Sequence, residues 1–255
     1  MVEAGLDLAG MADRFMRFDL SAFEDAALPS NVKLDVSCKS SNDLYLASSQ
    51  RSKVDIKFKF SDRSAGNKIF VDNALSFRGT INVNGSNNIV FVSESDQKLT
   101  CTIDVRGQNN SLFIGRNTSI NQANLLVDGD GSRLTIGDEC MLSYGIRVRT
   151  SDSHAIIDLK KRQQINHSQD VVIGPRVWIA SNVMVLKGTT IGEGSVIAAA
   201  SVVTKSVPAV SLAAGIPARV IRKNVSWSRA SLPKQAEIDR IADHFEEEGL
   251  LDDLD

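Results

Sequence analysis

Aromatic residues are scarce in this chain, making up 5% of its 255 residues. This scarcity predicts a narrow interior filled by small aliphatic side chains. Basic and acidic residues nearly balance, at 29 against 31, so no excess charge indicates nucleic acid or an anionic membrane as a partner. No apolar run approaches the length needed to cross a bilayer, and the first residues have no basic leader and are a poor signal peptide. No membrane insertion is therefore expected.

Cysteine is also rare. Cys38, Cys101 and Cys140 are odd in number, and none belongs to a C-x-x-C pair. This usage is typical of reduced, buried thiols in a cytoplasmic protein rather than of disulfides.

What the chain does contain is a six-residue repeat over residues 173–207. Branched aliphatic residues recur at every sixth position: Ile173, Ile179, Val185, Ile191, Ile197 and Val203. The residue after each is mostly small, and the residue four places later is small or β-branched. A period of six matches neither a helix, at 3.6, nor an isolated strand, at 2, and is typical of a hexapeptide β-helix.

Each hexad predicts one short strand and one corner, so that three hexads form a coil of a triangular prism. The branched aliphatic points inward, and the small residue after it avoids crowding at the corner. Stacked coils share backbone hydrogen bonds, so the core grows by adding neighbours. The pattern alone does not specify the handedness of the coil.

A looser repeat of 22 residues lies upstream. The pentapeptide that begins at Ile81 is echoed from Ile103 and from Leu125, and each copy ends in glycine. We interpret these segments as coils of the same solenoid. Hexads reappear within them at Ile114, Ile120 and Leu126, and at Ile136, Leu142 and Val148. Asparagine pairs at 87–88 and 109–110 suit left-handed turns.

These patterns divide the chain into three segments. Residues 1–30 are predicted to be a cap, with a short amphipathic helix carrying Leu8, Met11, Phe15 and Phe18. Residues 31–225 are the predicted β-helix, with a projecting loop at 155–171. Residues 226–255 are predicted to contain a helix, with Ile238, Ile241 and Phe245 on one face and Gly249 at its end, followed by an acidic tail.

The repeat is interrupted where the next hexad would begin, at His154. The stretch that follows is polar and charged, which predicts a loop with His154 at its root. A histidine there suits acid–base chemistry because imidazole titrates near neutral pH, and a solvated corner histidine fits the same spacing. Trp178, one of two tryptophans in the chain, follows in the next coil.

Several ordered motifs in residues 103–227 resemble the hexapeptide-repeat, left-handed β-helix acetyltransferases. They are S-D-x-H at 151–154, R-x-x-I-N-H at 162–167, I-G-x-x-V-W-I at 173–179, V-V-T-K-x-V-P at 202–208 and A-G-x-P-A-x-V-I-R at 214–222. The chain is similar to galactoside and maltose acetyltransferases, and closer to enzymes that O-acetylate capsular or surface polysaccharides, including polysialic acid. The resemblance implies an all-β, left-handed parallel β-helix with short terminal helical segments. It further implies transfer of acetyl from acetyl-CoA to a sugar hydroxyl of a surface glycan.

The resemblance places the family's catalytic histidine at His154, as general base for the acceptor hydroxyl. Trp178 falls on the family's tryptophan beside the pantetheine arm, where its N–H contributes to catalysis near the thioester. Asp152 is a candidate either for orienting His154 or for forming a turn. Neither a covalent enzyme intermediate nor a metal is required.

The resemblance also implies contacts to both substrates. For coenzyme A they are Trp178, Ser181, Ala199, Thr204, Lys205, Arg219 and Arg222, because small residues admit the pantetheine and basic residues suit phosphates. Candidate acceptor contacts are Asp152, Asn124, Lys161 and Arg162. The basic triplet at 160–162 suits an acidic glycan and a solvated loop tip equally. Family enzymes are trimers with sites between subunits, so a homotrimer with a glycan or sugar acceptor is expected.

Other functions fit parts of the pattern. N-acetylation of a nucleotide-linked amino sugar uses a similar base and cofactor and stays open. Serine O-acetylation usually brings a larger helical N-terminal domain, which residues 1–30 do not supply. A β-helical carbonic anhydrase needs three converging histidines, whereas two of the three here lie outside the regular coils. A non-catalytic structural or binding solenoid is the alternative from another class, and the loop, His154 and Trp178 argue against it.

Overall fold

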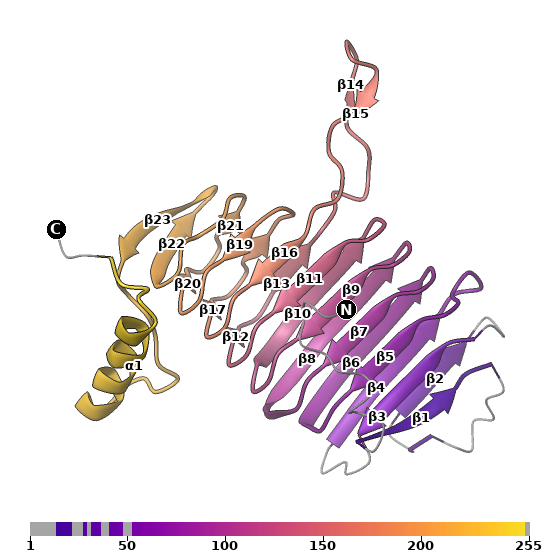
Figure 1. Ribbon diagram of the computed structural model, residues 1–255, viewed down its shortest axis with the longest axis horizontal. Coiled ribbons are helices and arrows are strands. Elements are labelled where there is room, and N and C mark those ends of the chain that lie inside the picture. Colours follow the sequence, from indigo (N-terminus) through magenta and orange to yellow (C-terminus); the bar gives the residue numbers. More distant parts are fainter. Residues whose placement is uncertain (1–13, 22–27, 30–31, 37–40, 48–52, 253–255) are drawn as a thin grey trace.

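The chain winds into a three-sided solenoid of stacked coils (Figure 1). The computed structural model describes residues 14–21, 28–29, 32–36, 41–47 and 53–252. Strands of successive coils pair side by side in parallel, so each side of the solenoid is a sheet face. The predicted fold class, an all-β parallel β-helix, is confirmed.

Face 1 is an eight-stranded sheet. In order of pairing, its strands are β1 (Phe15–Asp19), β3 (Asp43–Ala47), β5 (Lys68–Val71), β7 (Ile89–Val92), β9 (Ser111–Ile114), β11 (Arg133–Ile136), β16 (Val171–Ile173) and β19 (Thr190–Ile191). All neighbours are parallel except β1, which pairs antiparallel with β3 at the edge of the sheet.

The short helix predicted to carry Phe15 and Phe18 is wrong at these two positions, which lie on β1. Phe15 is buried against the outward rings of Phe70 and Phe91, with centroids 5.7 and 6.3 Å away. A strand here pairs with the open edge of face 1 and at the same time covers the outward rings of Phe70 and Phe91. A helix cannot do both. The other two residues of the predicted helix lie outside the described part of the chain.

Faces 2 and 3 are formed together by a second sheet, of 13 strands. In the first coils it consists of β2 (Val32–Val36), β4 (Lys53–Phe60), β6 (Ala74–Asn84), β8 (Ser95–Arg106) and β10 (Ser119–Asp128), the longest of which bend over both faces. Beyond β10 the faces separate. Face 2 continues as β12 (Met141–Leu142), β17 (Trp178–Ile179), β20 (Val196–Ile197), β22 (Ser211–Gly215) and β23 (Ala218–Lys223). Face 3 continues as β13 (Ile146–Arg149), β18 (Met184–Val185) and β21 (Val202–Val203).

A register shift in β10 between Ile120 and Ala123 marks the bend from face 2 to face 3. From Ile120 to Leu125 the strand takes five residues, whereas the next coil takes six from Leu142 to Val148 (125 − 120 and 148 − 142). Leu125 is fully buried and pairs with Val148. The hexad position predicted at Leu126 is wrong by one residue for this reason.

The hexad repeat forms a continuous core. All six predicted aliphatics are completely buried: Ile173, Ile179, Val185, Ile191, Ile197 and Val203. Strand register also confirms the two coil lengths. Ile81 lies opposite Ile103, a separation of 22 residues (103 − 81), and Val185 lies opposite Val203, a separation of 18 (203 − 185).

Buried asparagines form a ladder along one corner of the early coils. Nδ2 of Asn88 donates to Oδ1 of Asn67 at 2.9 Å, and the backbone N–H of Asn110 donates to Oδ1 of Asn88 at 2.9 Å. Asn87 and Asn109, which precede two rungs, each have a φ of 57°. The left-handed turns predicted at the asparagine pairs are thus confirmed, and the second asparagine of each pair links adjacent coils.

The glycine that ends each 22-residue repeat sits where adjacent coils touch. Gly107 has a φ of +93°, and a Cβ atom on it would lie 2.2 Å from the carbonyl oxygen of Gly129 in the next coil. A side chain here would force the coils apart, which explains why the repeat retains glycine.

The predicted C-terminal helix is present as α1 (Gln235–Glu247), with Gly249 just beyond it at a φ of +64°. Its Phe245 is buried and packs on Gly194 in the corner between faces 1 and 2. The guanidinium carbon of Arg176 lies 5.7 Å from the centre of that ring. Helix α1 therefore packs against the side of the last coils (Figure 1).

Candidate active site

His154 lies at the corner between faces 3 and 1, here called the 3–1 corner. Face 3 reaches this corner with β13, and face 1 resumes at β16. Between them, β14 (Ile157–Asp158) and β15 (Gln163–Gln164) pair antiparallel and form a hairpin that projects from the solenoid (Figure 1). His154 is exposed at the base of this hairpin, so a loop with His154 at its root is observed.

Three side chains close the base of the hairpin. Oδ2 of Asp152 accepts hydrogen bonds from Nζ of Lys187 at 2.5 Å and from Nδ2 of Asn166 at 2.8 Å. Nδ2 of Asn166 also donates to the carbonyl oxygen of His154 at 2.8 Å. Oδ1 of Asn166 accepts from the N–H of Ile156 at 2.6 Å. We call Asp152, Asn166 and Lys187 the loop clamp.

The attraction between the charges of Lys187 and Asp152 stabilises the loop clamp in addition to its hydrogen bonds. The hydrogen bond from Lys187 holds the pKa of Asp152 below its ordinary value of 3.8, and Asn166 acts in the same direction. The contribution of Asp152 to stability is therefore present above pH 3.8 and is lost as the pH falls through the lower folded-state pKa. At neutral pH the clamp is intact, and Asp152 contacts the backbone of His154 through Asn166.

Sequence reasoning assigned no role to Asn166 or Lys187. Asn166 lies within the R-x-x-I-N-H motif, so a signal for it was present. Lys187 is 35 residues from Asp152, and the two meet only because the coils stack.

Trp178 lies on face 2, on strand β17. The next residue, Ile179, points into the core, so the indole points outward. There it meets Trp227 at a centroid distance of 6.2 Å. Face 3 lies between Trp178 and the 3–1 corner, so a single chain does not bring Trp178 and His154 together.

The predicted coenzyme A contacts fall into two groups. Ser181 and Ala199 occupy the corner between faces 2 and 3 in adjacent coils, where the N–H of Ala200 donates to the carbonyl oxygen of Ser181 at 2.8 Å. Arg219 and Arg222 are exposed on β23, beside β22 at the end of face 2. These residues lie on the same side of face 3 as Trp178.

Thr204 and Lys205 lie on the other side of face 3. They follow β21 and are exposed at the 3–1 corner. The N–H of Leu186 donates to the carbonyl oxygen of Val203 at 3.0 Å, which stacks this turn on the one that carries Lys187. The second group therefore shares a corner with His154 and the loop clamp.

The predicted acceptor contacts lie on face 3 and on the hairpin. Asn124 of β10 lies opposite Arg147 of β13, and both line a groove of about 300 Å³ on this face. Lys161 and Arg162 are exposed at the turn of the hairpin. Asn182 also lines the groove, so the groove adjoins the first group of predicted coenzyme A contacts at Ser181.

The two described cysteines are not candidates for covalent catalysis. Cys101 and Cys140 are free and buried, as predicted, and burial raises the pKa of each thiol to about 12. A thiol with so high a pKa stays protonated at neutral pH and is a poor nucleophile. Cys38 lies outside the described residues. Among the described residues, no three His, Cys, Asp or Glu side chains gather as metal ligands, and no helix there is long and apolar enough to span a membrane.

Comparison with known proteins agrees with this architecture. Residues 170–205 match the bacterial transferase hexapeptide (six repeats) family. The polysialic acid O-acetyltransferase of Escherichia coli O1:K1 / APEC is 36% identical over 100 residues, which is 39% of this chain. That alignment spans only 33% of the length of the relative.

Two solved structures match most of the chain. The polySia specific acetyltransferase NeuO matches with a TM-score of 0.76 and 29% identity, over 87% of this chain and 92% of that one. The polysialic acid O-acetyltransferase OatWY matches with a TM-score of 0.64 and 26% identity, over 84% of this chain and 96% of that one. Residues 170–205 thus match a hexapeptide-repeat family, and the predicted resemblance of the chain to the polysialic acid O-acetyltransferases is confirmed.

Proposed function

We propose that the protein is an acetyl-CoA-dependent O-acetyltransferase that modifies a hydroxyl group of a surface glycan. The observation that carries the proposal is the exposed His154, whose backbone the loop clamp holds at the base of a projecting hairpin. The matched structures support the proposal, because both are named as acetyltransferases of polysialic acid.

In the proposed reaction, His154 takes the proton of the acceptor hydroxyl as that oxygen attacks the carbonyl carbon of the thioester. The C–S bond then breaks, the acetyl group stays on the sugar oxygen, and the thiolate of coenzyme A takes up the proton from the imidazolium. Such general base catalysis typically contributes about 10²–10⁴ in rate. The indole N–H of Trp178 is proposed to stabilise the negative charge that develops on the thioester oxygen.

We further propose that each site forms between two copies of the chain in a homotrimer. One group of predicted site residues lies with His154 at the 3–1 corner, and the other lies with Trp178 across face 3. A ring in which the 3–1 corner of one copy packs beside face 2 of the next would unite the two groups. The groove at Asn124 would then lie within the assembled site.

The groove also supports a proposal about the acceptor. Arg147 lines it, and Lys161 and Arg162 lie on the neighbouring hairpin. Guanidinium and ammonium groups suit the carboxylates of an acidic glycan. We therefore propose an acidic surface glycan as the acceptor. The buried free thiols of Cys101 and Cys140 suit a reducing compartment, which supports a cytoplasmic site of action.

The function is tested by binding and turnover of acetyl-CoA. A ligand that binds only the folded protein adds about 2.7 kcal/mol to its stability at 100 times Kd. Acetyl-CoA should therefore raise the unfolding temperature by several degrees, and polysialic acid should stimulate thiol release. The product should lose its acetyl group in mild alkali, as an ester does and an amide does not. Absence of both the temperature shift and thiol release from a panel of polysaccharides, oligosaccharides and sugar nucleotides would refute the proposal.

Replacing Lys187 with methionine should slow acetyl transfer without weakening the binding of acetyl-CoA. The substitution removes the hydrogen bonds to Asp152 and to the carbonyl oxygen of Asn166, so His154 loses its fixed position. Misplacing a catalytic group by about 1 Å can cost on the order of 100-fold in rate. Steady-state kinetics should show a kcat lower by about 10- to 100-fold with little change in the KM for acetyl-CoA. The matched control is Lys98→Met on the exposed side of β8, which should keep the wild-type kcat; an equal loss in both variants would contradict the role of the clamp.

A further inference from the structure

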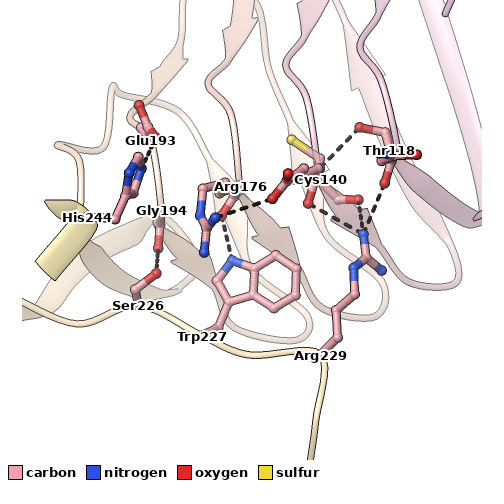
Figure 2. Close-up of polar contacts among 11 residues, drawn as sticks. Thr118, Cys140, Arg176, Glu193, Gly194, Ser226, Trp227, Arg229 and His244 are labelled. Carbon is pink, nitrogen blue, oxygen red and sulfur yellow. Dashed lines mark hydrogen bonds and ion pairs between the residues drawn. The ribbon is translucent and has the colours of Figure 1, made fainter. Parts of the chain in front are cut away.

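A short C-terminal segment crosses the corner between faces 1 and 2 (Figure 2). This segment, residues 226–229, is here called the strap. Oγ of Ser226 donates to the carbonyl oxygen of Gly194 at 2.9 Å, and Nε1 of Trp227 donates to the carbonyl oxygen of Arg176 at 2.5 Å. Because Gly194 and Arg176 belong to adjacent coils, the strap lies along the stack of the solenoid.

Arg229 fastens the far end of the strap. Its guanidinium donates to Oγ of Ser119 at 2.9 Å and to the carbonyl oxygen of Cys140 at 3.0 Å. Two longer hydrogen bonds reach the carbonyl oxygens of Asn117 and Glu139, at 3.3 and 3.4 Å. Desolvation by the groups around the guanidinium lowers the pKa of Arg229. The strap is therefore tied to the solenoid on both sides of Trp227.

The chain after the strap is fixed as well. Oγ of Ser228 donates to Oε1 of Glu237 in α1 at 2.5 Å. His244 of α1 contacts Glu193 at 3.1 Å, and Phe245 is buried against Gly194. Helix α1 thus holds the strap from its C-terminal side, and Figure 2 shows the contact between His244 and Glu193.

What the strap presents to face 2 is the ring of Trp227. This ring lies 6.2 Å from the ring of Trp178, at an interplanar angle of 48°. The guanidinium carbon of Arg229 lies 5.6 Å from the centre of the Trp227 ring. Cation–π and aromatic contacts of this kind each contribute to holding a ring in one orientation. A chain of contacts therefore runs from Arg229 through Trp227 to Trp178.

The aromatic contact of Trp178 does not come from its neighbours on face 2. β17 contains two residues. Trp178 is paired in register with Met141 of the preceding coil and with Val196 of the following coil. Neither partner is aromatic, so the ring contact of the outward indole is with Trp227. The indole of Trp178 thus contacts a segment 49 residues further along the chain (227 − 178).

We propose that the strap positions the indole of Trp178 for acetyl transfer, with Trp227 as the positioning residue and Arg229 as its anchor. The proposal rests on the role of Trp178 in the proposed function. It assigns a task in catalysis to a segment outside the hexapeptide repeat. Trp227 acts only through Trp178 and needs no contact with either substrate.

The test compares Trp227→Ala with Trp227→Phe, using thiol release from acetyl-CoA in the presence of polysialic acid. Alanine removes the ring contact, and kcat should fall by about 10- to 100-fold with a smaller change in the KM for acetyl-CoA. Phenylalanine retains a ring against Trp178 and should keep kcat within about threefold of wild type. Arg229→Gln leaves both rings in place and should lower kcat in the same direction, so the test survives if Trp227→Ala does not fold. The control is Leu232→Ala, because Leu232 is 90% exposed in the linker to α1.

A spectroscopic measurement separates positioning from stability. The chain has two tryptophans, so Trp178 is the sole tryptophan in both Trp227 variants. Acrylamide should quench its fluorescence faster in Trp227→Ala than in Trp227→Phe. If the strap only stabilises the fold, Trp227→Ala will melt earlier but keep both the wild-type kcat and the quenching of Trp227→Phe, which overturns the proposal. An inactive wild-type protein would instead overturn the proposed function, and this proposal with it.

Discussion

Replacing His154 with alanine lowers kcat for acetyl transfer by about 10²–10⁴-fold, because the acceptor hydroxyl loses its general base. Binding of acetyl-CoA should persist, since the side chain is exposed. The unfolding temperature of the free protein should stay within about a degree or two of wild type, as for other exposed positions. Thiol release and thermal shift, measured on the same preparation, check both expectations.

A second histidine supplies the control for this prediction. His244 lies on α1 and contacts Glu193 rather than the hairpin or the groove. Asparagine keeps a hydrogen-bond donor for Glu193, so α1 and the strap stay in place and His244→Asn should retain turnover close to wild type. Activity that survives in His154→Ala, or that disappears equally in both variants, would argue against His154 as the base.

Replacing Asn88 with alanine should destabilise the solenoid strongly. The side chain is fully buried and takes part in three hydrogen bonds: Nδ2 donates to Oδ1 of Asn67 and to the carbonyl oxygen of Gly107, and Oδ1 accepts from the N–H of Asn110. Each buried group left without a partner costs about 1–3 kcal/mol. We expect a loss of roughly 3–5 kcal/mol, or a fall of about 6–20 °C in the unfolding temperature.

The matched control for the asparagine ladder is Asn109→Gly. Asn109 is exposed and has a φ of 57°, which glycine adopts without strain. The unfolding temperature of the Asn109→Gly variant should differ from that of wild type by no more than about two degrees. Circular dichroism melts of the two variants are compared directly, and equal shifts would contradict a structural role for the ladder.

The repeated coils could be predicted because each buried position depends on residues close to it in the sequence. Each inward position of the hexad repeat, such as Ile179 or Ile197, is determined by its own six residues, and the stacking only repeats the pattern. Leu126 shows the limit of this reasoning. The step from Ile120 to the inward Leu125 is one residue shorter than a hexad, and the spacing of aliphatic residues does not reveal such a shift.

The parts that were not predicted depend on contacts between distant residues. Phe15 lies on a strand because this strand pairs with the edge of face 1 and covers outward aromatic rings there. Lys187 reaches Asp152 from another coil, and Trp227 reaches Trp178 from beyond the repeat. The sequence around each of these residues does not indicate its distant partner.

The motifs predict His154 and Trp178 as site residues, and the family resemblance implies that sites lie between subunits. In the structure of one chain the two residues lie on different sides of face 3. The proposed activity therefore requires a neighbouring copy, and the central claim is that His154 of one copy works with Trp178 of the next.

Mixed assemblies test this claim most directly. His154→Ala and Trp178→Ala should each be inactive alone. If they are unfolded and refolded together at equal amounts, about one site in four pairs an intact His154 with an intact Trp178 from the neighbouring copy. Thiol release should then recover to about a quarter of the wild-type rate. A mixture that forms trimers but stays as inactive as its components would contradict a site shared between copies.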